Sequence, residues 1–461
     1  MISTTEKTND EYNKTMLTDL YQLTMNAAYY DNNKDEMATF DLFVRTMPEE
    51  WGYYITAGVE EAVDYATNIK FTKSNLEYLA SQNIFSKEYL EFLKDFKFEG
   101  EMYAIKEGTP ITTNTPIIRV TAKRTQAQFL ESTLLNIINY QTMIASKASR
   151  IVHAADGKDI VEFGLRRAQG EDAAIKGARA TYIAGAVGTS NVAAGEKYGI
   201  PISGTQAHSY IMSFPTEIEA FRSYAKTFPN SSVLLIDTYN TLNGAKNAII
   251  VAKELEENGH KLKGVRIDSG DLAENSKKVR EMFDNNGLDY VKIVVSNDLN
   301  EKKIMMLNAE GAKIDAYGVG TEMITAKPVA AISGVYKIVE DNGGPKIKLS
   351  EGKKTYPGMK QVYRVETENG YNHDILAIDG EYTTLKPLLE KVVEDGHRIS
   401  SRRELKAIRE YCLKEVAKLP AYTKELSARP YELRISEKLE GLVDELTEKY
   451  GGGNYDVHQG V

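Results

Sequence analysis

Short apolar runs, rich in β-branched residues and ending on small or polar ones, recur through the middle of the chain. They occupy 159–164, 232–238, 264–270, 291–298 and 314–320, and helical patterns fill 243–257, 271–286 and 298–310 between them. The last four runs centre near residues 236, 267, 294 and 317, which are 31, 27 and 23 residues apart. Such alternation predicts βα units with buried parallel strands, in an α/β barrel or an open doubly wound sheet. In either fold, ligands bind at the carboxyl ends of the strands.

The segments on either side have a mixed pattern. Residues 39–45 alternate apolar and polar positions, which is the period of a half-buried strand, whereas 74–97 have the pattern of helices. Two further helices are predicted over 400–418 and 433–449. A long helix is predicted over 126–153, and we interpret its regularly spaced apolar residues as core: Phe129, Leu134, Ile137, Ile138, Met143 and Ile144.

Composition narrows the function classes. The chain has 461 residues, 42% hydrophobic and 27% charged, which is typical of a globular protein. Its 57 basic and 66 acidic residues give a net charge of −9. The chain therefore lacks the excess of basic residues that would indicate nucleic-acid binding. The single cysteine, Cys412, cannot form an internal disulfide or a cysteine-ligated zinc site. With a polar start at 1–10 and no long apolar stretch, we expect a cytoplasmic protein without a membrane span.

Several polar residues stand where the chemistry is expected. His208 lies between two of the apolar runs, and imidazole is suited to proton transfer or nucleophilic attack, although a lone histidine is more often structural. Arg166 and Arg167 follow the run at 159–164, where two adjacent guanidinium groups could bind a carboxylate or phosphate, with an ordinary salt bridge as the alternative.

Three aspartates and a glycine motif also close these runs. Asp237, Asp268 and Asp271 could hold Mg²⁺, ribose hydroxyls or a histidine, while Asp268 and Asp271 could equally cap the next helix. The segment 318–321 places two glycines before a predicted helix, where backbone N–H groups can approach a phosphate. No P-loop, dinucleotide-binding fingerprint, nucleophile elbow or zinc-protease motif is present.

Taken together and in order, these segments resemble nicotinate phosphoribosyltransferase, a type II phosphoribosyltransferase. The matching motifs are 17–25, 162–170, 188–191, 204–208, 236–239, 265–271, 296–298, 318–321 and 348–364. The resemblance implies an irregular α/β barrel joined to a mixed α+β domain built from both chain ends. We accordingly expect an N-terminal mixed domain over 1–125, the barrel over 126–335, and a C-terminal segment over 336–461 that packs with both.

The resemblance also implies the activity. Nicotinate and 5-phosphoribosyl-1-pyrophosphate would give nicotinate mononucleotide and pyrophosphate, as the entry point of NAD salvage from nicotinic acid. The reaction would be coupled to ATP hydrolysis through a phosphohistidine, making the enzyme both a ligase and a glycosyltransferase, and would require Mg²⁺. Family members work as homodimers with active sites shared between subunits.

Residue roles carry over position by position. Phe163 and a partner subunit's Tyr21 resemble the aromatic pair that sandwiches the pyridine ring, and His208 matches the histidine phosphorylated by ATP. The other assignments are Arg166 and Arg266 to the substrate carboxylate and ribosyl phosphates, Asp268 to the ribose, Asp237 to orienting the histidine, Gly318, Gly320 and Thr321 to the 5′-phosphate, and Asp19 and Thr205 to substrate binding.

Ser190 bears on specificity. In the related nicotinamide enzymes the matching position is an aspartate, which would accept a hydrogen bond from a carboxamide and repel a carboxylate. A neutral serine removes that repulsion and can donate a hydrogen bond, which favours the acid over the amide.

Three alternatives compete with this interpretation. A type II relative that acts on nicotinamide or quinolinate is disfavoured by Ser190 and by the intact motif at 204–208, since quinolinate enzymes lack the ATP-linked histidine. A lyase or aldolase barrel would need a strand-end lysine for a Schiff base, and none stands out. A catalytically dead binding protein would be expected to have lost His208, Arg166 or Asp268.

Overall fold

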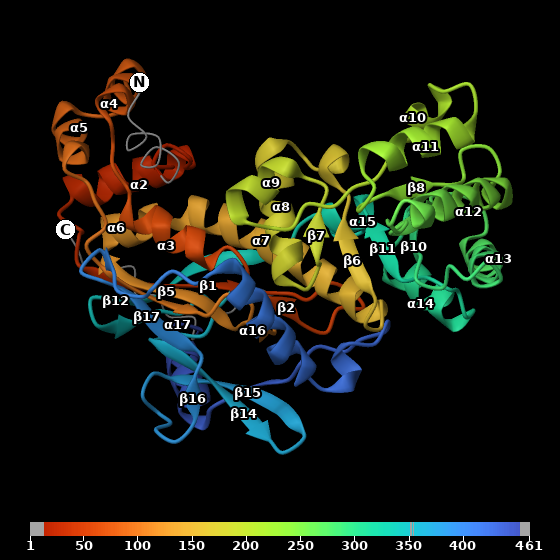
Figure 1. Cartoon of the computed structure of the whole chain (residues 1–461). Coiled ribbons are helices and arrows are strands. Elements are labelled where there is room, and N and C mark those ends of the chain that lie inside the picture. Colours follow the sequence, from red (N-terminus) through yellow and green to blue (C-terminus); the bar gives the residue numbers. More distant parts are fainter. Residues whose placement is uncertain (1–12, 351–352, 354, 452–461) are drawn as a thin grey trace. The chain divides into compact units, whose positions relative to one another are not determined.

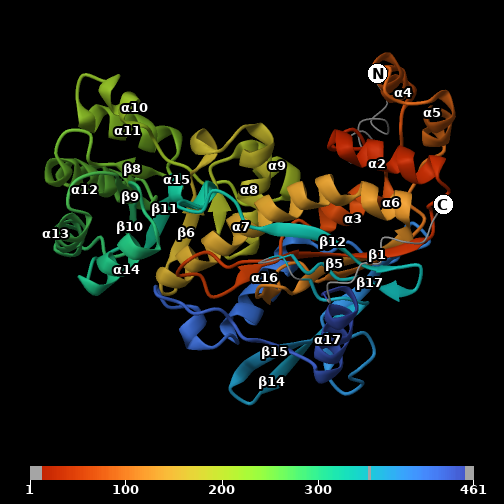
Figure 2. The ribbon, with the colours of Figure 1, turned by 180° about the vertical axis from the view of Figure 1, so that it is seen from behind.

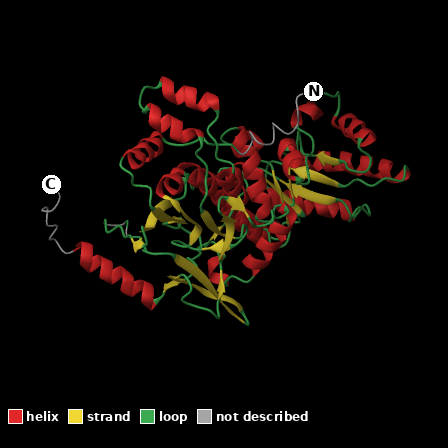
Figure 3. Cartoon of the chain, turned by 90° about the vertical axis from the view of Figure 1, so that its left-hand side faces the viewer, coloured by secondary structure: helices red, strands yellow, loops and turns green. Residues whose placement is uncertain are grey.

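The computed structural model describes residues 13–350, 353 and 355–451. The polar start at 1–10 and the glycine-rich end beyond residue 451 therefore lie outside the described residues. The chain forms two compact units, one made of 144–330 and the other of 1–143 together with 331–461. Each unit contains both helices and strands. Figure 3 shows the helices, strands and loops of the chain in separate colours.

The unit formed by 144–330 is built around a six-stranded parallel sheet. Its strand order is β7-β6-β11-β10-β9-β8, and every neighbouring pair runs in the same direction. The sheet curls as a half-barrel (Figures 1 and 2). The strands are β6 (Asp159–Glu162), β7 (Gly188–Thr189), β8 (Val233–Leu235), β9 (Gly264–Ile267), β10 (Lys292–Val295) and β11 (Ala316–Val319). The predicted α/β barrel is confirmed in this irregular form.

Helices alternate with these strands, as predicted. They are α8 (Glu171–Ile183), α9 (Val192–Tyr198), α10 (His208–Met212), α11 (Glu217–Thr227), α12 (Thr241–Glu257), α13 (Leu272–Asp284), α14 (Glu301–Ala309) and α15 (Thr321–Ile324), with a 3₁₀ turn, η1, at Leu165–Arg167. Side-chain caps set where several of them begin. Asp271 accepts a 3.0 Å hydrogen bond from Glu274 N at the start of α13. The sequence left open whether this aspartate binds a ligand or caps the helix, and the structure supports the cap.

The other unit joins the two ends of the chain in one antiparallel sheet. Its order is β13-β12-β1-β5-β3-β17-β18. Strands from the two ends of the chain pair at two places, β1 with β12 and β3 with β17. The strands are β1 (Met37–Val44), β3 (Glu101–Ile105), β5 (Pro116–Lys123), β12 (Gly334–Asp341), β13 (Gly344–Pro345), β17 (Leu389–Glu394) and β18 (His397–Arg398). The expected mixed domain built from both chain ends is therefore confirmed.

Two smaller sheets and several helices complete this unit. A four-stranded sheet has the order β16-β14-β15-β19, and β2 pairs with β4. These strands are β2 (Tyr54–Ile55), β4 (Pro110–Ile111), β14 (Lys360–Thr367), β15 (Gly370–Ile378), β16 (Lys386–Pro387) and β19 (Leu433–Ile435). The helices are α2 (Leu20–Asp31), α3 (Val59–Thr67), α4 (Lys73–Ser81), α5 (Lys87–Lys94), α6 (Arg124–Phe129), α16 (Leu405–Ala417) and α17 (Glu437–Gly451), with a 3₁₀ turn, η2, at Ala421–Thr423.

Two predicted helices differ in detail from the structure. The helix expected over 126–153 is two consecutive helices, α6 and α7 (Glu131–Ala154), and its six predicted core residues are all buried. The helix expected from residue 433 begins only at Glu437, because Leu433–Ile435 forms strand β19 and pairs in parallel with β15. Among the described residues, no helix combines the length and apolar character that a bilayer crossing requires.

Candidate functional site

A cavity of about 580 Å³ opens at the carboxyl ends of the parallel strands. It is lined by Phe163, Arg166, Ser190, Gly204, Thr205, Gln206, Ala207, His208, Arg266 and Asp268. These residues follow or end strands β6, β7 and β9, or lie in the segment that leads into α10. Seven of the residues assigned to the site from sequence therefore meet around one cavity, in the place that the fold class predicts for a ligand.

Phe163 forms one wall, and Gly318 allows it to do so. A Cβ atom at residue 318 would lie only 2.4 Å from the Phe163 ring, so any larger residue would displace the ring. The backbone N–H of Phe163 also donates to the Val319 carbonyl at 2.8 Å. The sequence assigned Gly318 to a phosphate cradle together with Gly320 and Thr321, which lie at the junction of β11 and α15. The structure adds a packing function for Gly318, and the cradle stays a prediction.

Arg266 is held by hydroxyl and carbonyl oxygens around its guanidinium group. Its Nη1 donates to Thr205 Oγ1 at 2.7 Å and to the Gln206 carbonyl at 3.2 Å. Its Nε donates to Ser296 Oγ at 3.1 Å, and Nη2 lies 3.5 Å from Asp268 Oδ1. Ser296 Oγ in turn donates to Asp268. This network fixes a cation and a carboxylate side by side, an arrangement that suits an oxyanion next to a sugar hydroxyl.

His208 is the first residue of α10, and its side chain is about 40% exposed. Its Nδ1 lies 3.1 Å from Thr238 Oγ1, and its Nε2 lies 3.7 Å from Asp268 Oδ2. We expected Asp237 to orient this histidine, but Asp237 Oδ2 instead accepts from Asp268 N at 2.9 Å and from Ser269 Oγ at 2.6 Å. Thr238, one residue further along the same motif, makes the contact with His208.

Arg166 and Ser190 lie on the same cavity. Arg166 is exposed in η1 and makes no ion pair within the described residues, so its guanidinium group is available to a ligand anion. Ser190 is half-buried, and its backbone N–H donates to the Glu162 carbonyl at 2.9 Å. A cation and a neutral hydroxyl thus accompany the Phe163 ring, which fits a planar aromatic carboxylate.

Glu162 is a site residue that the sequence analysis did not single out. Its side chain is fully buried, and it accepts hydrogen bonds from Gly164 N and, at 2.5 Å, from Thr189 Oγ1. Burial raises the pKa of this carboxyl above its ordinary value, against the lowering effect of the two hydrogen bonds. The only signal in the sequence was its place next to Phe163 at a strand end.

Asp19 and Tyr21 belong to the other compact unit. Asp19 precedes α2, and its Oδ2 accepts from Ser132 Oγ at 2.6 Å. Tyr21 lies in the first turn of α2 with 48% of its surface exposed. An exposed tyrosine ring is available to a ligand or a partner, and its assignment to the pyridine ring stays a prediction.

The carboxylates near the cavity bear on whether a divalent metal could bind there. Within the described part of the chain, no three histidine, cysteine, aspartate or glutamate side chains form a metal-binding group. Asp237 Oδ1 is, however, buried without a hydrogen-bond partner, beside the backbone of Asp268. Mg²⁺ commonly uses one or two carboxylates and takes its other ligands from water and substrate phosphates, so Asp268 on the cavity, with Asp237 behind it, has the donor chemistry that this ion prefers.

Three successive parts of the chain match the same protein family. Family models match in order: the nicotinate phosphoribosyltransferase N-terminal domain over residues 16–139, the nicotinate phosphoribosyltransferase family over 159–371, and the nicotinate phosphoribosyltransferase C-terminal domain over 377–443. A nicotinate phosphoribosyltransferase of Mycobacterium tuberculosis is 38% identical over 448 residues, covering 96% of both chains. One from Bacillus subtilis is 42% identical over 390 residues, covering 83% of this chain and 78% of its own.

A solved structure also resembles most of the chain. The human nicotinic acid phosphoribosyltransferase superposes with a TM-score of 0.83 at 27% sequence identity, covering 93% of this chain and 99% of its own.

Proposed function

The chain belongs to the nicotinate phosphoribosyltransferase family, and from this membership we propose that it joins nicotinate to 5-phosphoribosyl-1-pyrophosphate. The products would be nicotinate mononucleotide and pyrophosphate, in the salvage of NAD from nicotinic acid. The observation that carries the proposal is the single cavity on which an aromatic ring, two arginines, a serine, an aspartate and a histidine converge.

The substrate acid fits the part of the cavity near Phe163. The pyridine ring packs against the Phe163 ring, whose position depends on Gly318. The carboxylate is directed to Arg166, whose forked donors match two carboxylate oxygens, and to the Ser190 hydroxyl. The positive charge and the absence of a carboxylate at position 190 favour the acid over the amide.

The transfer step needs no protein nucleophile. The lone pair of the pyridine nitrogen forms the bond to C1 of the ribose while the bond from C1 to the pyrophosphate oxygen breaks. Positive charge develops on the ribose and negative charge on the leaving group. Arg266, fixed by Thr205 and Ser296, stabilises the anionic side, and Asp268 holds a ribose hydroxyl.

This chain has residues suited to binding the Mg²⁺ ion and the substrate 5′-phosphate that the family uses. Asp237 and Asp268 would hold Mg²⁺, which supplies charge neutralisation to the pyrophosphate when bound. Gly320 and Thr321, where β11 meets α15, would receive the 5′-phosphate through backbone N–H groups.

ATP coupling is assigned to His208. With Nδ1 occupied by Thr238, the free nitrogen is Nε2, which would take the γ-phosphoryl group as the bond to ADP breaks. Because Nε2 lies near Asp268, a phosphoryl group there would change the charge around the ribose site. Such a change supplies the differential binding of substrate that coupling to ATP requires.

The active sites are proposed to be shared in a homodimer. Tyr21 would come from the partner subunit and cover the face of the pyridine ring opposite Phe163. Support comes from the exposure of Tyr21 on α2 and from the family resemblance.

One assay tests the function directly. Purified protein is given labelled nicotinate or nicotinamide with phosphoribosyl pyrophosphate and Mg²⁺, with and without ATP. Nicotinate mononucleotide should form, faster with ATP, and nicotinamide should react poorly. Formation of the amide nucleotide at an equal rate, or no nucleotide at all, would overturn the proposal.

A further inference from the structure

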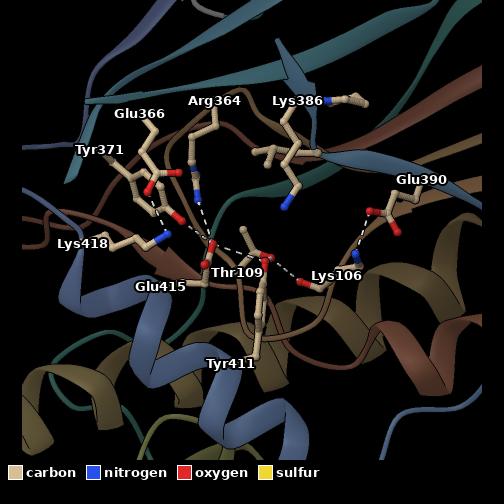
Figure 4. Close-up of a pocket in the computed structure, with 12 residues that line it drawn as sticks. Lys106, Thr109, Arg364, Glu366, Tyr371, Lys386, Glu390, Tyr411, Glu415 and Lys418 are labelled. Atoms are coloured by element: carbon tan, nitrogen blue, oxygen red, sulfur yellow. Dashed lines mark hydrogen bonds and ion pairs between the residues drawn. The ribbon is translucent and has the colours of Figure 1, made fainter. Parts of the chain in front are cut away.

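A second cavity, of about 80 Å³, lies entirely within the unit built from the two chain ends. Its walls come from β14, β15, β16, the start of β17, helix α16 and the loop after β3 (Figure 4). None of its residues belongs to the unit that carries the parallel sheet. The side chains around it are unusually polar, with four cations and three carboxylates.

The deepest cation is Arg364, whose side chain is only 4% exposed. Its Nε and Nη2 donate to the two oxygens of Asp374 at 2.9 and 2.8 Å, and Nη2 also donates to the Pro110 carbonyl at 2.6 Å. Its Nη1 has no hydrogen-bond acceptor, and the carboxylate of Glu415 remains 3.8 Å away. A buried N–H group without an acceptor is costly, so this face of the guanidinium group is suited to a ligand oxygen.

Lys386 lies across the cavity from Arg364 with its ammonium group directed into the space between them (Figure 4). This lysine is exposed on β16 and makes no ion pair within the described residues. Lys106 and Lys418 stand at the rim and pair with Glu390 and Glu366, each at 2.8 Å. Because both rim pairs are more than 40% exposed, they contribute little and their lysines can turn toward an anion.

Hydroxyl groups complete the lining. Thr109 Oγ1 lies 3.1 Å from the Tyr411 hydroxyl, and the Tyr371 hydroxyl donates to Glu415 at 2.7 Å. The Tyr411 hydroxyl donates to the same Glu415 carboxylate at 3.3 Å, and burial raises its pKa to about 12, so both tyrosines hold Glu415 in place beside Arg364. By its size, the cavity has space for roughly five water-sized groups, which is the number of heavy atoms in a phosphate ion.

We propose that this cavity is a binding site for a small tetrahedral oxyanion, a free phosphate ion or the phosphoryl group of a metabolite, between Arg364 and Lys386. The anion satisfies the open donor of Arg364 and the unpaired charge of Lys386, and the rim lysines close on it. The site is separate from the substrate cavity and goes beyond the proposed function.

The experiment is calorimetric titration of the full chain with inorganic phosphate, comparing wild type with Lys386→Ala and Lys386→Gln. Lys406→Ala is the matched control, because Lys406 is an exposed lysine on α16 outside this cavity. Phosphate affinity should fall by about tenfold or more in both Lys386 variants and stay unchanged in the control. Transferase activity without added phosphate should be the same in the control and in both Lys386 variants.

Phosphate can also occupy the substrate cavity, so Arg266→Ala is titrated in parallel. The binding that depends on Lys386 should survive in Arg266→Ala. Phosphate should therefore still raise the thermal midpoint of Arg266→Ala, because it binds the folded protein at the second cavity. Glycerol phosphate as a second probe distinguishes the sources: binding of both probes identifies the phosphoryl group, and binding of inorganic phosphate alone identifies the free ion. Phosphate affinity that is unchanged in the Lys386 variants, or that disappears entirely in Arg266→Ala, would overturn the site.

Discussion

The carboxylate of Glu162 accepts a hydrogen bond from the hydroxyl of Thr189, with Oε2 and Oγ1 2.5 Å apart. This bond joins the carboxyl ends of β6 and β7, while the other carboxylate oxygen accepts from Gly164 N. Phe163 and Ser190, which flank the proposed nicotinate position, each lie next to a residue of this linkage. The buried carboxyl group therefore acts with the backbone pairing of β6 and β7 to position Phe163 relative to Ser190, the residue proposed to determine specificity.

Replacing Glu162 by Gln should raise the KM for nicotinate several-fold and change kcat less. The amide would place an NH₂ group against Thr189 Oγ1, which would then have to accept where it now donates, at a cost of about 1 kcal/mol. Steady-state kinetics measure the split, with Glu310→Gln, an exposed glutamate at the end of α14, as control. An equal loss in kcat and no change in KM would contradict the positioning function.

The same carboxyl should make stability depend on pH. Because burial raises its folded pKa above the unfolded value near 4.5, the folded state binds this proton more tightly than the unfolded state. Its contribution to stability is therefore present at low pH and is lost as pH rises from 4.5 through the folded pKa. The thermal midpoint of wild type should fall relative to Glu162→Gln over that range and then level off. A difference that stays constant with pH would show that the folded pKa is not raised.

Ser190→Asp should weaken the use of nicotinate by about tenfold or more, since a like-charge pair in a partly buried site costs on the order of a few kcal/mol. Ser190→Ala is the matched variant, because it removes the hydroxyl without adding charge, and it should lose less. The measurement is kcat/KM for nicotinate and for nicotinamide. If the aspartate variant used nicotinate as efficiently as wild type, Ser190 would not lie at the carboxylate end of the pocket.

The sequence predicted those parts of the site whose residues are placed by the pattern of their own segment. Phe163 and Asp268 directly follow strand runs, and Arg266 lies near the end of one, so these residues meet at one sheet edge whatever the details of packing. The sequence does not tell which of two neighbours faces a histidine: the family resemblance points to Asp237, whereas Thr238 makes the contact in the structure. Nor does it show that Gly318 must be small for the Phe163 ring, because that contact joins residues 155 positions apart in the chain.

The same limit applies to the strands. Strand β19 was predicted as part of a helix, since its three residues carry no period and gain their conformation from pairing with β15. Two-residue strands such as β7 are likewise defined by their neighbours in the sheet and not by their own composition.

The proposed sharing of active sites between subunits predicts complementation between inactive variants. Tyr21→Ala and His208→Ala should each be inactive or nearly so in the ATP-coupled reaction, and a mixed dimer should regain one complete site. Activity should therefore recover toward about a quarter of wild type, because half of the dimers are mixed at equal amounts and each has one of two sites intact. The mixture is assayed after subunit exchange has been verified. If exchange occurs and no activity returns, Tyr21 acts within its own subunit.

His208 should be phosphorylated by ATP, on Nε2, without being the nucleophile of the transfer itself. Its Nδ1 is held by Thr238 at 3.1 Å, so Nε2 is the nitrogen with a free lone pair in the tautomer that donates to the threonine. His208→Ala should abolish ATP hydrolysis and labelling from γ-labelled ATP, while slow ATP-independent transfer survives because the pyridine nitrogen attacks C1 directly. Thr238→Val should reduce phosphorylation less, since it loosens the ring without removing it. The adduct is mapped by mass spectrometry as an acid-labile, base-stable phosphoryl group. A phosphoryl group on another residue, or full stimulation by ATP in His208→Ala, would contradict the assignment.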